Sequence, residues 1–216
     1  MKSVILWDND GVLVRTEDFF FLATRHVLRD LDVDLDRDAY LRLFLEESVD
    51  PLHRVLGELG READFGELHR IRLQRHVELL RTRDITVEGA ADTVRALAGT
   101  HRMAVVTGAK RAHVEVLQAR TDFFHLFDFI VTREDVTETK PSPVPYLQAV
   151  RRIGARVENC IAVEDSERGL RSAKAAGLEC WIIPNGLTAG SSFGAADRIL
   201  VDVREVRTLL DNGGAT

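Results

Sequence analysis

The sequence predicts an α/β fold: a Rossmann-like core built on a parallel sheet, with an all-helical segment inserted after the first strand. Short apolar runs recur along the chain, and in its second half they alternate with stretches of helical periodicity. Strands that are apolar throughout and separated by helices are typical of a parallel sheet covered on both faces. The stretch from about residue 16 to residue 86 breaks this alternation, since it contains many helix formers and no convincing strand pattern.

The chain of 216 residues is long enough for one sizeable core with a smaller appended unit. We predict that residues 1–14 and 87–216 form the core and that residues 15–86 form a helical cap. Six segments have the apolar composition of buried strands. They are Val4–Trp7, Met103–Thr107, Phe129–Thr132, Cys160–Glu164, Cys180–Ile183 and Ile199–Val201.

Helices between the later strands are indicated by apolar residues at helical spacing. These residues are Ala91, Val94, Leu97 and Ala98; Val114 and Leu117, with Phe124 beyond them; Val144, Leu147 and Val150; and Leu170, Ala173 and Ala176, followed by a stop at Gly177. In the inserted segment the expected helices are Glu17–Leu31, Arg37–Leu45, Pro51–Leu59 and Glu62–Arg81. Leu73, Val77 and Leu80 would give the last of these one apolar face.

Charge and hydropathy exclude several classes of partner. The formal net charge is −6, from 29 Lys and Arg against 35 Asp and Glu, and no basic patch dominates, so nucleic acid is not expected. No apolar run approaches the ~20 residues that span a bilayer, so we expect no membrane segment, and we expect no signal peptide. Cys160 and Cys180 lie in apolar runs, which predicts reduced core residues of a cytoplasmic protein.

The most informative segment is Asp8-Asn9-Asp10-Gly11, which directly follows the apolar run Val4–Trp7. Side chains alternate along an extended segment, so Asp8 and Asp10 would share a face. Two neighbouring carboxylates repel each other unless a cation lies between them or one is protonated, which suits Mg²⁺. They also suit a nucleophile beside an acid/base. Taken alone, the segment fits a strand followed by an ordinary Asp-Gly turn equally well.

Three further segments carry polar residues that match this pattern. The hydroxyl of Thr107 and the amide of Gly108 follow a strand and could donate to phosphate oxygens. Lys140 precedes Pro141, which favours an extended conformation and a fixed ammonium group, although a single lysine is usually solvated. Glu164-Asp165 ends a strand, and Ser166 could cap the helix that follows. Ligands of open α/β sheets collect at such strand ends.

These motifs, in this order, resemble the haloacid dehalogenase superfamily, in the phosphoglycolate phosphatase and β-phosphoglucomutase-like branch that carries a helical cap after its first motif. Asp8-Asn9-Asp10-Gly11-Val12-Leu13 matches the first motif, Thr107-Gly108 the second, Lys140-Pro141 the third and Glu164-Asp165 the fourth. The match covers nearly the whole chain, and the cap is its weakest part. The resemblance implies a Mg²⁺-dependent phosphatase of a small phosphorylated metabolite, a phosphoric monoester hydrolase that is a monomer or a weak homodimer.

The resemblance also implies a role for each residue. Asp8 attacks phosphorus and becomes an aspartyl-phosphate, Asp10 protonates the leaving oxygen and then helps to activate water, and Lys140 stabilises the developing charge. Thr107 and Gly108 hold the phosphoryl oxygens together with Lys140. The metal ligands are then Asp8, the Asp10 carbonyl and Asp165, with Glu164 in a supporting position.

Departures from the family pattern bear on the competing hypotheses. Arg15 stands where relatives often carry Asp, and Phe20 stands where the sugar-phosphate mutases place a histidine. A Gly-rich, Arg-containing cap segment of those mutases has no counterpart in residues 44–49. Both absences disfavour a phosphosugar mutase. A catalytically silent binding protein would be expected to lose Asp8, Asp10 or Lys140, and a dehalogenase would not need Asp10.

Overall fold

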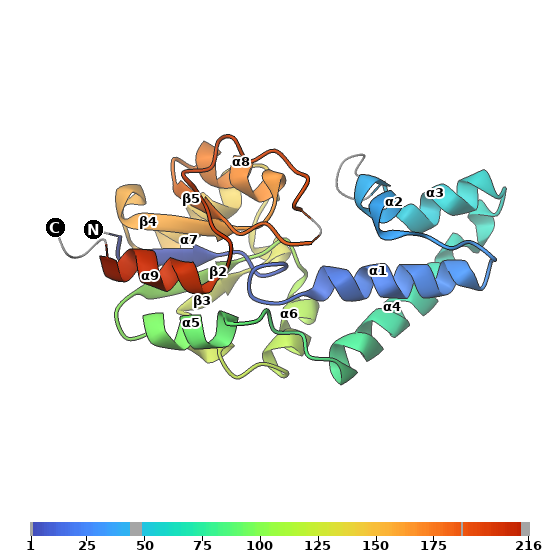
Figure 1. Ribbon diagram of the computed structural model, residues 1–216, viewed down its shortest axis with the longest axis horizontal. Coiled ribbons are helices and arrows are strands. Elements are labelled where there is room, and N and C mark those ends of the chain that lie inside the picture. The colour runs from blue at the N-terminus through green and yellow to red at the C-terminus, as the bar shows by residue number, and fades with distance from the viewer. Residues whose placement is uncertain (1, 44–48, 187, 213–216) are drawn as a thin grey trace. The chain divides into compact units, whose positions relative to one another are not determined.

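The computed structural model describes residues 2–43, 49–186 and 188–212, and the chain divides into two compact units. One unit comprises Met1–Arg15 with Thr86–Thr216, and the other comprises Thr16–Ile85. The first unit contains the sheet, and the second is helical (Figure 1). Within the described residues no helix is both long and apolar enough to cross a bilayer.

The first unit is built on a six-stranded sheet in the order β3-β2-β1-β4-β5-β6, in which every strand pair is parallel. The strands are β1 (Val4–Trp7), β2 (Arg102–Val106), β3 (Phe129–Val131), β4 (Cys160–Glu164), β5 (Glu179–Ile182) and β6 (Arg198–Ile199). Each overlaps a predicted strand, which confirms the α/β class. Because β1 lies between β2 and β4 and all three run the same way, their carboxyl ends meet at one edge.

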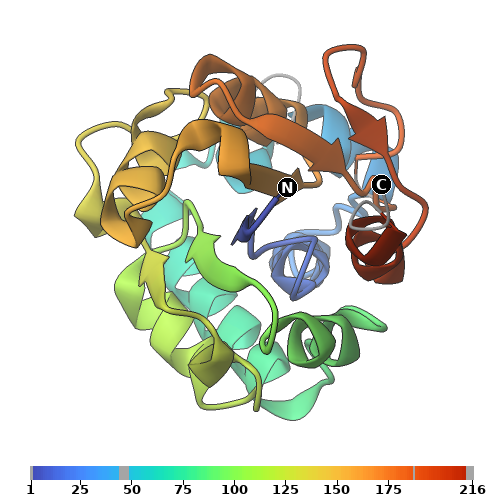
Figure 2. The same ribbon diagram turned by 90° about the vertical axis from the view of Figure 1, so that its left-hand side faces the viewer.

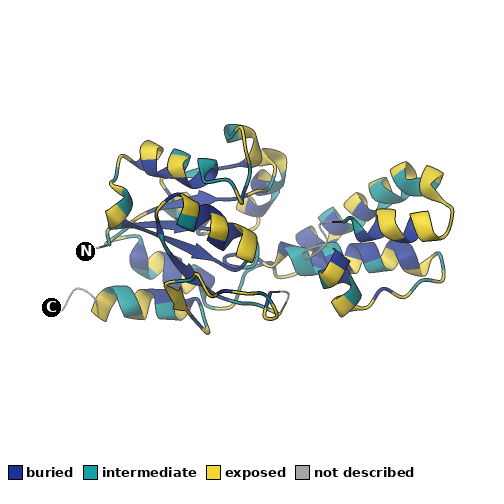
Figure 3. Ribbon diagram, turned by 90° about the horizontal axis from the view of Figure 1, so that it is seen from above, coloured by how far each residue is buried: buried dark blue, intermediate teal, exposed yellow. Residues whose placement is uncertain are grey.

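Helices lie on both faces of this sheet (Figure 2). They are α5 (Ala90–Leu97), α6 (Arg111–Gln118), α7 (Val144–Ile153), α8 (Glu167–Ala175) and α9 (Arg204–Asn212), with short 3₁₀ turns η3 (Phe124–Leu126), η4 (Arg133–Asp135) and η5 (Val157–Asn159). Helices α7 and α8 pack on the face that carries Val4 and Leu6, where they form one apolar cluster. The central strands β1 and β4 are buried along their whole length, as expected for a covered parallel sheet, whereas β6 at the edge is exposed (Figure 3).

Three details of this unit differ from the sequence-based expectation. Phe124 belongs to η3 and does not extend α6. Leu147 is 40% exposed, whereas its neighbour Tyr146 is fully buried, so the inward face of α7 is displaced by one position. Helix α9 was not predicted, although Val206, Leu209 and Leu210 stand at helical spacing; Val206 is buried and the two leucines are half-buried.

The second unit contains α1 (Thr16–Arg29), α2 (Arg37–Leu41), α3 (Pro51–Glu58), η2 (Glu62–Asp64) and α4 (Phe65–Thr82). Aspartate side chains cap two of them, since Asp36 accepts from the amide of Ala39 and Asp50 from that of Leu52. A small core of its own, which includes Phe21, Tyr40 and Leu56, explains how this segment folds as a unit. The last predicted residues of the second helix and most of the 44–49 segment lie outside the described residues.

The buried face of α4 matches the prediction only at Leu80. Leu73 is 42% exposed and Val77 is half-buried, whereas Arg72, His76, Leu79 and Leu80 are buried. Arg72 is fully enclosed because its guanidinium donates to both carboxylate oxygens of Asp50, at 2.7 and 2.6 Å. A search for apolar periodicity overlooks a face on which a buried arginine is neutralised by a partly exposed aspartate.

Candidate active site

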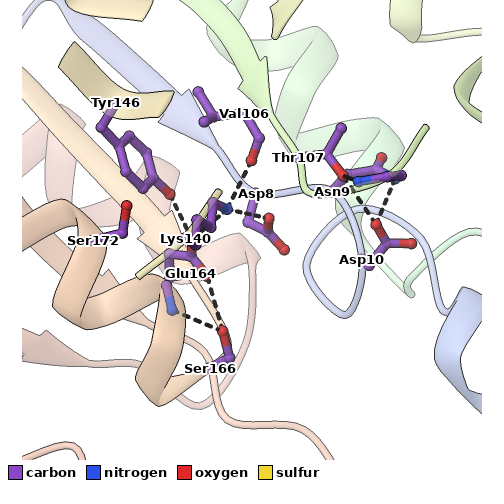
Figure 4. Close-up of polar contacts among 12 residues, drawn as sticks. Asp8, Asn9, Asp10, Val106, Thr107, Lys140, Tyr146, Glu164, Ser166 and Ser172 are labelled. Atoms are coloured by element: carbon purple, nitrogen blue, oxygen red, sulfur yellow. Dashed lines mark hydrogen bonds and ion pairs between the residues drawn. The ribbon is translucent and has the colours of Figure 1, made fainter. Parts of the chain in front are cut away.

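The candidate site lies at the carboxyl ends of the central strands. Asp8 directly follows β1, Thr107 follows β2, and Glu164 and Asp165 close β4. Lys140 comes from the loop between η4 and α7 and reaches the same place. The parallel order of β2, β1 and β4 therefore brings the first, second and fourth predicted motifs together, and the loop before α7 adds Lys140 to them (Figure 4).

Lys140 is the central cation of the site. Its Nζ lies 2.5 Å from Oδ1 of Asp8, 2.6 Å from Oε1 of Glu164 and 2.8 Å from the carbonyl oxygen of Val106 (Figure 4). The residue is only 6% exposed, so the alternative of a solvated lysine does not hold. Burial alone would lower its pKa, but the carboxylates of Asp8 and Glu164 outweigh that effect and raise it, so the amine stays charged.

Asp8, Glu164 and Asp165 form an acidic cluster in which one ligand atom of each lies within 4.8 Å of the others. Burial, reinforced by the neighbouring carboxylates Glu164 and Asp10, raises the pKa of Asp8 to about 7 against the opposing effect of Lys140. Burial and the charges of Asp8 and Glu164 also raise the pKa of Asp165. Three carboxylates face one ammonium here, and a hard divalent cation would relieve this repulsion, so the donor set fits Mg²⁺.

Asp10 is held apart from this cluster. Its Oδ2 accepts a hydrogen bond from the hydroxyl of Thr107 at 3.2 Å and from the side-chain amide of Asn9 at 3.3 Å (Figure 4). Thr107 thus orients a carboxylate, and its oxygen also accepts from the amide of Ala109 at 3.0 Å. Gly108, the other predicted phosphate ligand, follows Thr107 in the sequence and is exposed to solvent. This separation of the carboxylates suits different tasks for Asp8 and Asp10.

Two glycines allow the acidic residues to take these positions. A Cβ on Gly169 would lie 1.9 Å from Oε2 of Glu164, and one on Gly11 would lie 2.0 Å from Oδ2 of Asp165. Gly11 also has a φ of +86°, which favours glycine. Ser166 is the N-cap of α8, because its oxygen accepts from the amide of Gly169 at 3.1 Å. The predicted capping role of Ser166 is therefore confirmed.

Two residues at the site were missed by the sequence analysis. The side-chain amide of Asn185, in the loop after β5, donates to Oδ2 of Asp165 at 2.7 Å. The hydroxyl of Tyr146, on α7, donates to Oε1 of Glu164 at 2.6 Å (Figure 4). A polar residue beyond the carboxyl end of another parallel strand could have suggested Asn185, whereas nothing in the pattern around Tyr146 distinguishes it from a core aromatic.

In the helical unit, Phe20 is a packing residue. Its ring lies 4.6 Å from the guanidinium carbon of Arg72 and contacts the ring of His76 edge to face, with centroids 5.2 Å apart. The neighbouring Phe19 and Phe21 are buried. Phe20 therefore stabilises the helical unit through aromatic and cation–π contacts, and Phe21 packs against the ring of Tyr40 in the same unit.

Comparison with known proteins identifies relatives that span the chain. A family model described as haloacid dehalogenase-like hydrolase matches residues 5–183. Protein CbbY of Rhodobacter capsulatus is 31% identical over 217 residues, covering 95% of this chain and 96% of CbbY. Fructose-1-phosphate phosphatase YqaB of Escherichia coli is 30% identical over 179 residues, covering 81% of this chain and 93% of YqaB.

A solved structure is similar over the same length. A CbbY mutant from Rhodobacter sphaeroides, crystallised in complex with xylulose-(1,5)bisphosphate, superposes with a TM-score of 0.72 at 32% identity. The match covers 95% of this chain and 96% of the other. Fold and sequence therefore agree across both compact units and not only across the sheet.

Proposed function

Since the chain belongs to the haloacid dehalogenase-like hydrolase family and is one of its phosphatases, we propose that it hydrolyses a small phosphorylated sugar through an aspartyl-phosphate on Asp8, with Mg²⁺ as its cofactor. The observation that carries this proposal is the contact of the Lys140 ammonium with Asp8 inside a buried acidic cluster. This arrangement supplies the three parts that phosphoryl transfer needs: a nucleophilic carboxylate, an ammonium group beside it and a cluster of oxygen ligands for a metal ion.

The chain's own residues account for both chemical steps. In the first, an oxygen of the Asp8 carboxylate bonds to phosphorus while the bond from phosphorus to the sugar oxygen breaks, and Asp10 donates its proton to that oxygen. In the second, water attacks the aspartyl-phosphate, Asp10 accepts the proton of that water, and phosphate and free Asp8 are released. The contact of Thr107 with Asp10 supports this role by orienting the acid.

Charge on the transferring group is stabilised by Lys140. The amide of Gly108 would bind its oxygens, together with the hydroxyl of Thr107 once that hydroxyl turns from Asp10 to the substrate. Asp8, Asp165 and the carbonyl of Asp10 would hold Mg²⁺, with Glu164 in support through Lys140. When bound, the ion supplies positive charge at the nucleophile and the phosphoryl group.

The names of two relatives support a sugar phosphate as the substrate. One is a fructose-1-phosphate phosphatase, and the other was crystallised with xylulose-(1,5)bisphosphate. Both compounds are phosphorylated ketoses, so we propose this class for the present chain. The helical unit would act as the cap that selects among them.

The test is phosphate release from a panel of ketose and aldose phosphates, with Mg²⁺ or with excess EDTA, by the wild type and Asp8→Asn. We expect Mg²⁺-dependent hydrolysis that is strongest with ketose phosphates and abolished by Asp8→Asn, since an amide is a poor nucleophile. Trapping of labelled phosphate on the wild type but not on Asp8→Asn would identify the intermediate. Undiminished activity of a folded Asp8→Asn variant, or full activity in EDTA, would refute the proposal.

A further inference from the structure

Glu164 lies in the most enclosed part of the site. Its side chain is fully buried, and a carboxylate in such a position needs both opposite charge and hydrogen bonds. Lys140 provides the charge, but the same ammonium also contacts Asp8. Two carboxylates therefore compete for one cation.

Tyr146 supplies the other short hydrogen bond to Glu164. Its hydroxyl lies 2.6 Å from Oε1, the same oxygen that accepts from Lys140 at 2.6 Å (Figure 4). The tyrosine is itself fully buried, and burial together with the charge of Glu164 raises the pKa of its hydroxyl well above the usual range. The hydroxyl therefore stays protonated and remains a donor.

The aromatic ring of Tyr146 limits where Lys140 can lie. The ring centroid is 5.1 Å from Nζ, within the range of a cation–π contact. On its other side, Glu164 is confined by Gly169, where a Cβ would lie 1.9 Å from Oε2. The carboxylate is thus fixed by an ammonium, a phenol and a close backbone.

We propose that Tyr146 is a positioning residue for phosphoryl transfer: by holding Glu164, it keeps the Lys140 ammonium against Asp8. This inference rests on the proposed function. The hydroxyl of Ser166 reaches only the other oxygen of Glu164, Oε2, at 3.5 Å (Figure 4). Without the phenol, Oε1 of Glu164 would therefore be left with Lys140 alone, and the ammonium would move away from the nucleophile. Tyr146 is fully buried behind Glu164 and Lys140, so its effect should appear in the chemical step and not in substrate binding.

The decisive variant is Tyr146→Phe, which removes the hydroxyl and keeps the ring in its core position. We expect kcat to fall about tenfold with KM within about twofold, since misplacing a catalytic group impairs the chemical step more than ground-state binding. The matched control is Ile153→Val on the same helix and in the same apolar cluster. It should lower Tm by a similar or larger amount while kcat stays within about twofold of wild type.

A double-mutant cycle with Glu164→Gln tests whether Tyr146 acts through Glu164. In the Glu164→Gln background, Tyr146→Phe should change kcat by less than about twofold, because the acceptor is already altered. An equal fall in both backgrounds would overturn the inference, as would a wild-type kcat in Tyr146→Phe. If Glu164→Gln does not fold, the comparison of kcat and Tm between Tyr146→Phe and Ile153→Val is by itself the test of the inference.

The same assay separates this inference from the proposed function. Failure of the wild type to release phosphate from any sugar phosphate would count against the function itself. An active wild type with an equally active Tyr146→Phe would refute only the positioning role.

Discussion

The side-chain amide of Asn185 holds the carboxylate of Asp165, with Nδ2 2.7 Å from Oδ2. Its nitrogen also lies 3.4 Å from the carbonyl oxygen of Gly11, so it connects the loop after β5 with the loop after β1. The hydrogen bond from Asn185 lowers the pKa of Asp165 against the larger raising effect of burial. Asn185 therefore favours the ionised form that a cation requires.

The first prediction concerns this pair. Asn185→Ala should weaken Mg²⁺ binding by about tenfold or more, as is usual for residues that orient a metal ligand. The measurement is calorimetric titration with Mg²⁺, which does not depend on turnover. Asn159→Ala is the control, because Asn159 directly precedes β4 and therefore lies at the amino ends of the strands, away from the carboxyl ends that carry the site. Equal affinities for Asn185→Ala and wild type would contradict the prediction.

The second prediction concerns Asp10. Asp10→Asn should lower kcat by about 10²-fold or more, the usual contribution of a positioned acid or base. Thr107→Val should have a smaller effect on kcat, because it removes one donor to Asp10 and leaves the carboxylate and its hydrogen bond from Asn9. Steady-state kinetics with one sugar phosphate compares them, with circular dichroism to establish folding. Comparable kcat values for wild type and Asp10→Asn would exclude the acid/base role.

A third prediction follows from the close approach of Gly169 to Glu164. Gly169→Ala should lower both stability and kcat, because the new Cβ would lie 1.9 Å from Oε2 and displace the carboxylate. Gly66→Ala is the matched control, since Gly66 is also helical and a Cβ added there would meet nothing within 4 Å. That control should stabilise by up to about 1 kcal/mol through helix propensity. Thermal melts that rank the two variants in the opposite order would refute the argument.

The fourth prediction is a pH dependence of stability in the helical unit. Burial alone would raise the pKa of Asp50, but hydrogen bonds and charge from Arg72 outweigh it, so its pKa is lowered on folding. A lowered pKa means that the pair stabilises the fold above the unfolded pKa of Asp50 and that this contribution is lost as pH falls through the folded value.

Asp50→Asn preserves the N-cap and removes the charge, so it leaves the fully buried guanidinium of Arg72 without its counter-charge. We expect a cost of about 3 kcal/mol at pH 7, the lower end of the range for breaking a buried pair, because Asp50 itself is partly exposed. The difference from wild type should shrink below about pH 4, where the unfolded aspartate is protonated. Urea unfolding of both proteins at pH 7 and below about pH 4 measures this difference in the free energy of unfolding. Asp34→Asn, which breaks an exposed pair with Arg25, should cost less than about 1 kcal/mol. A difference that is independent of pH would contradict the linkage.

The fifth prediction separates a phosphatase from a mutase. Phe20 packs on Arg72 and His76 and has no titratable group, so it cannot relay a proton as a histidine at its position could. We therefore expect net phosphate release and no efficient interconversion of hexose 1- and 6-phosphates. Incubation with Mg²⁺, β-glucose 1-phosphate and a bisphosphate primer checks this. Rapid formation of glucose 6-phosphate with little free phosphate would establish the mutase instead.

The α/β class and the family could be predicted because their determinants are local. A buried parallel strand is apolar at every position, so β1 and β4 were found with their observed limits. The acidic residues that end those strands are adjacent to them in sequence, and parallel pairing brings strand ends to one edge. The structure accordingly places Asp8, Lys140, Glu164 and Asp165 together, while their catalytic roles stay predictions.

Tertiary structure alone decided which other residues complete the site. Asn185 and Tyr146 lie 20 and 18 positions from the acidic residues they contact, and no local periodicity relates them. The same holds for Arg72, which is turned inward because Asp50, 22 positions away, pairs with it. Strands and motifs follow from the preferences of neighbouring residues. A buried charge, in contrast, needs a partner because its desolvation is costly, and that partner can come from a distant segment that is brought near only by the tertiary fold.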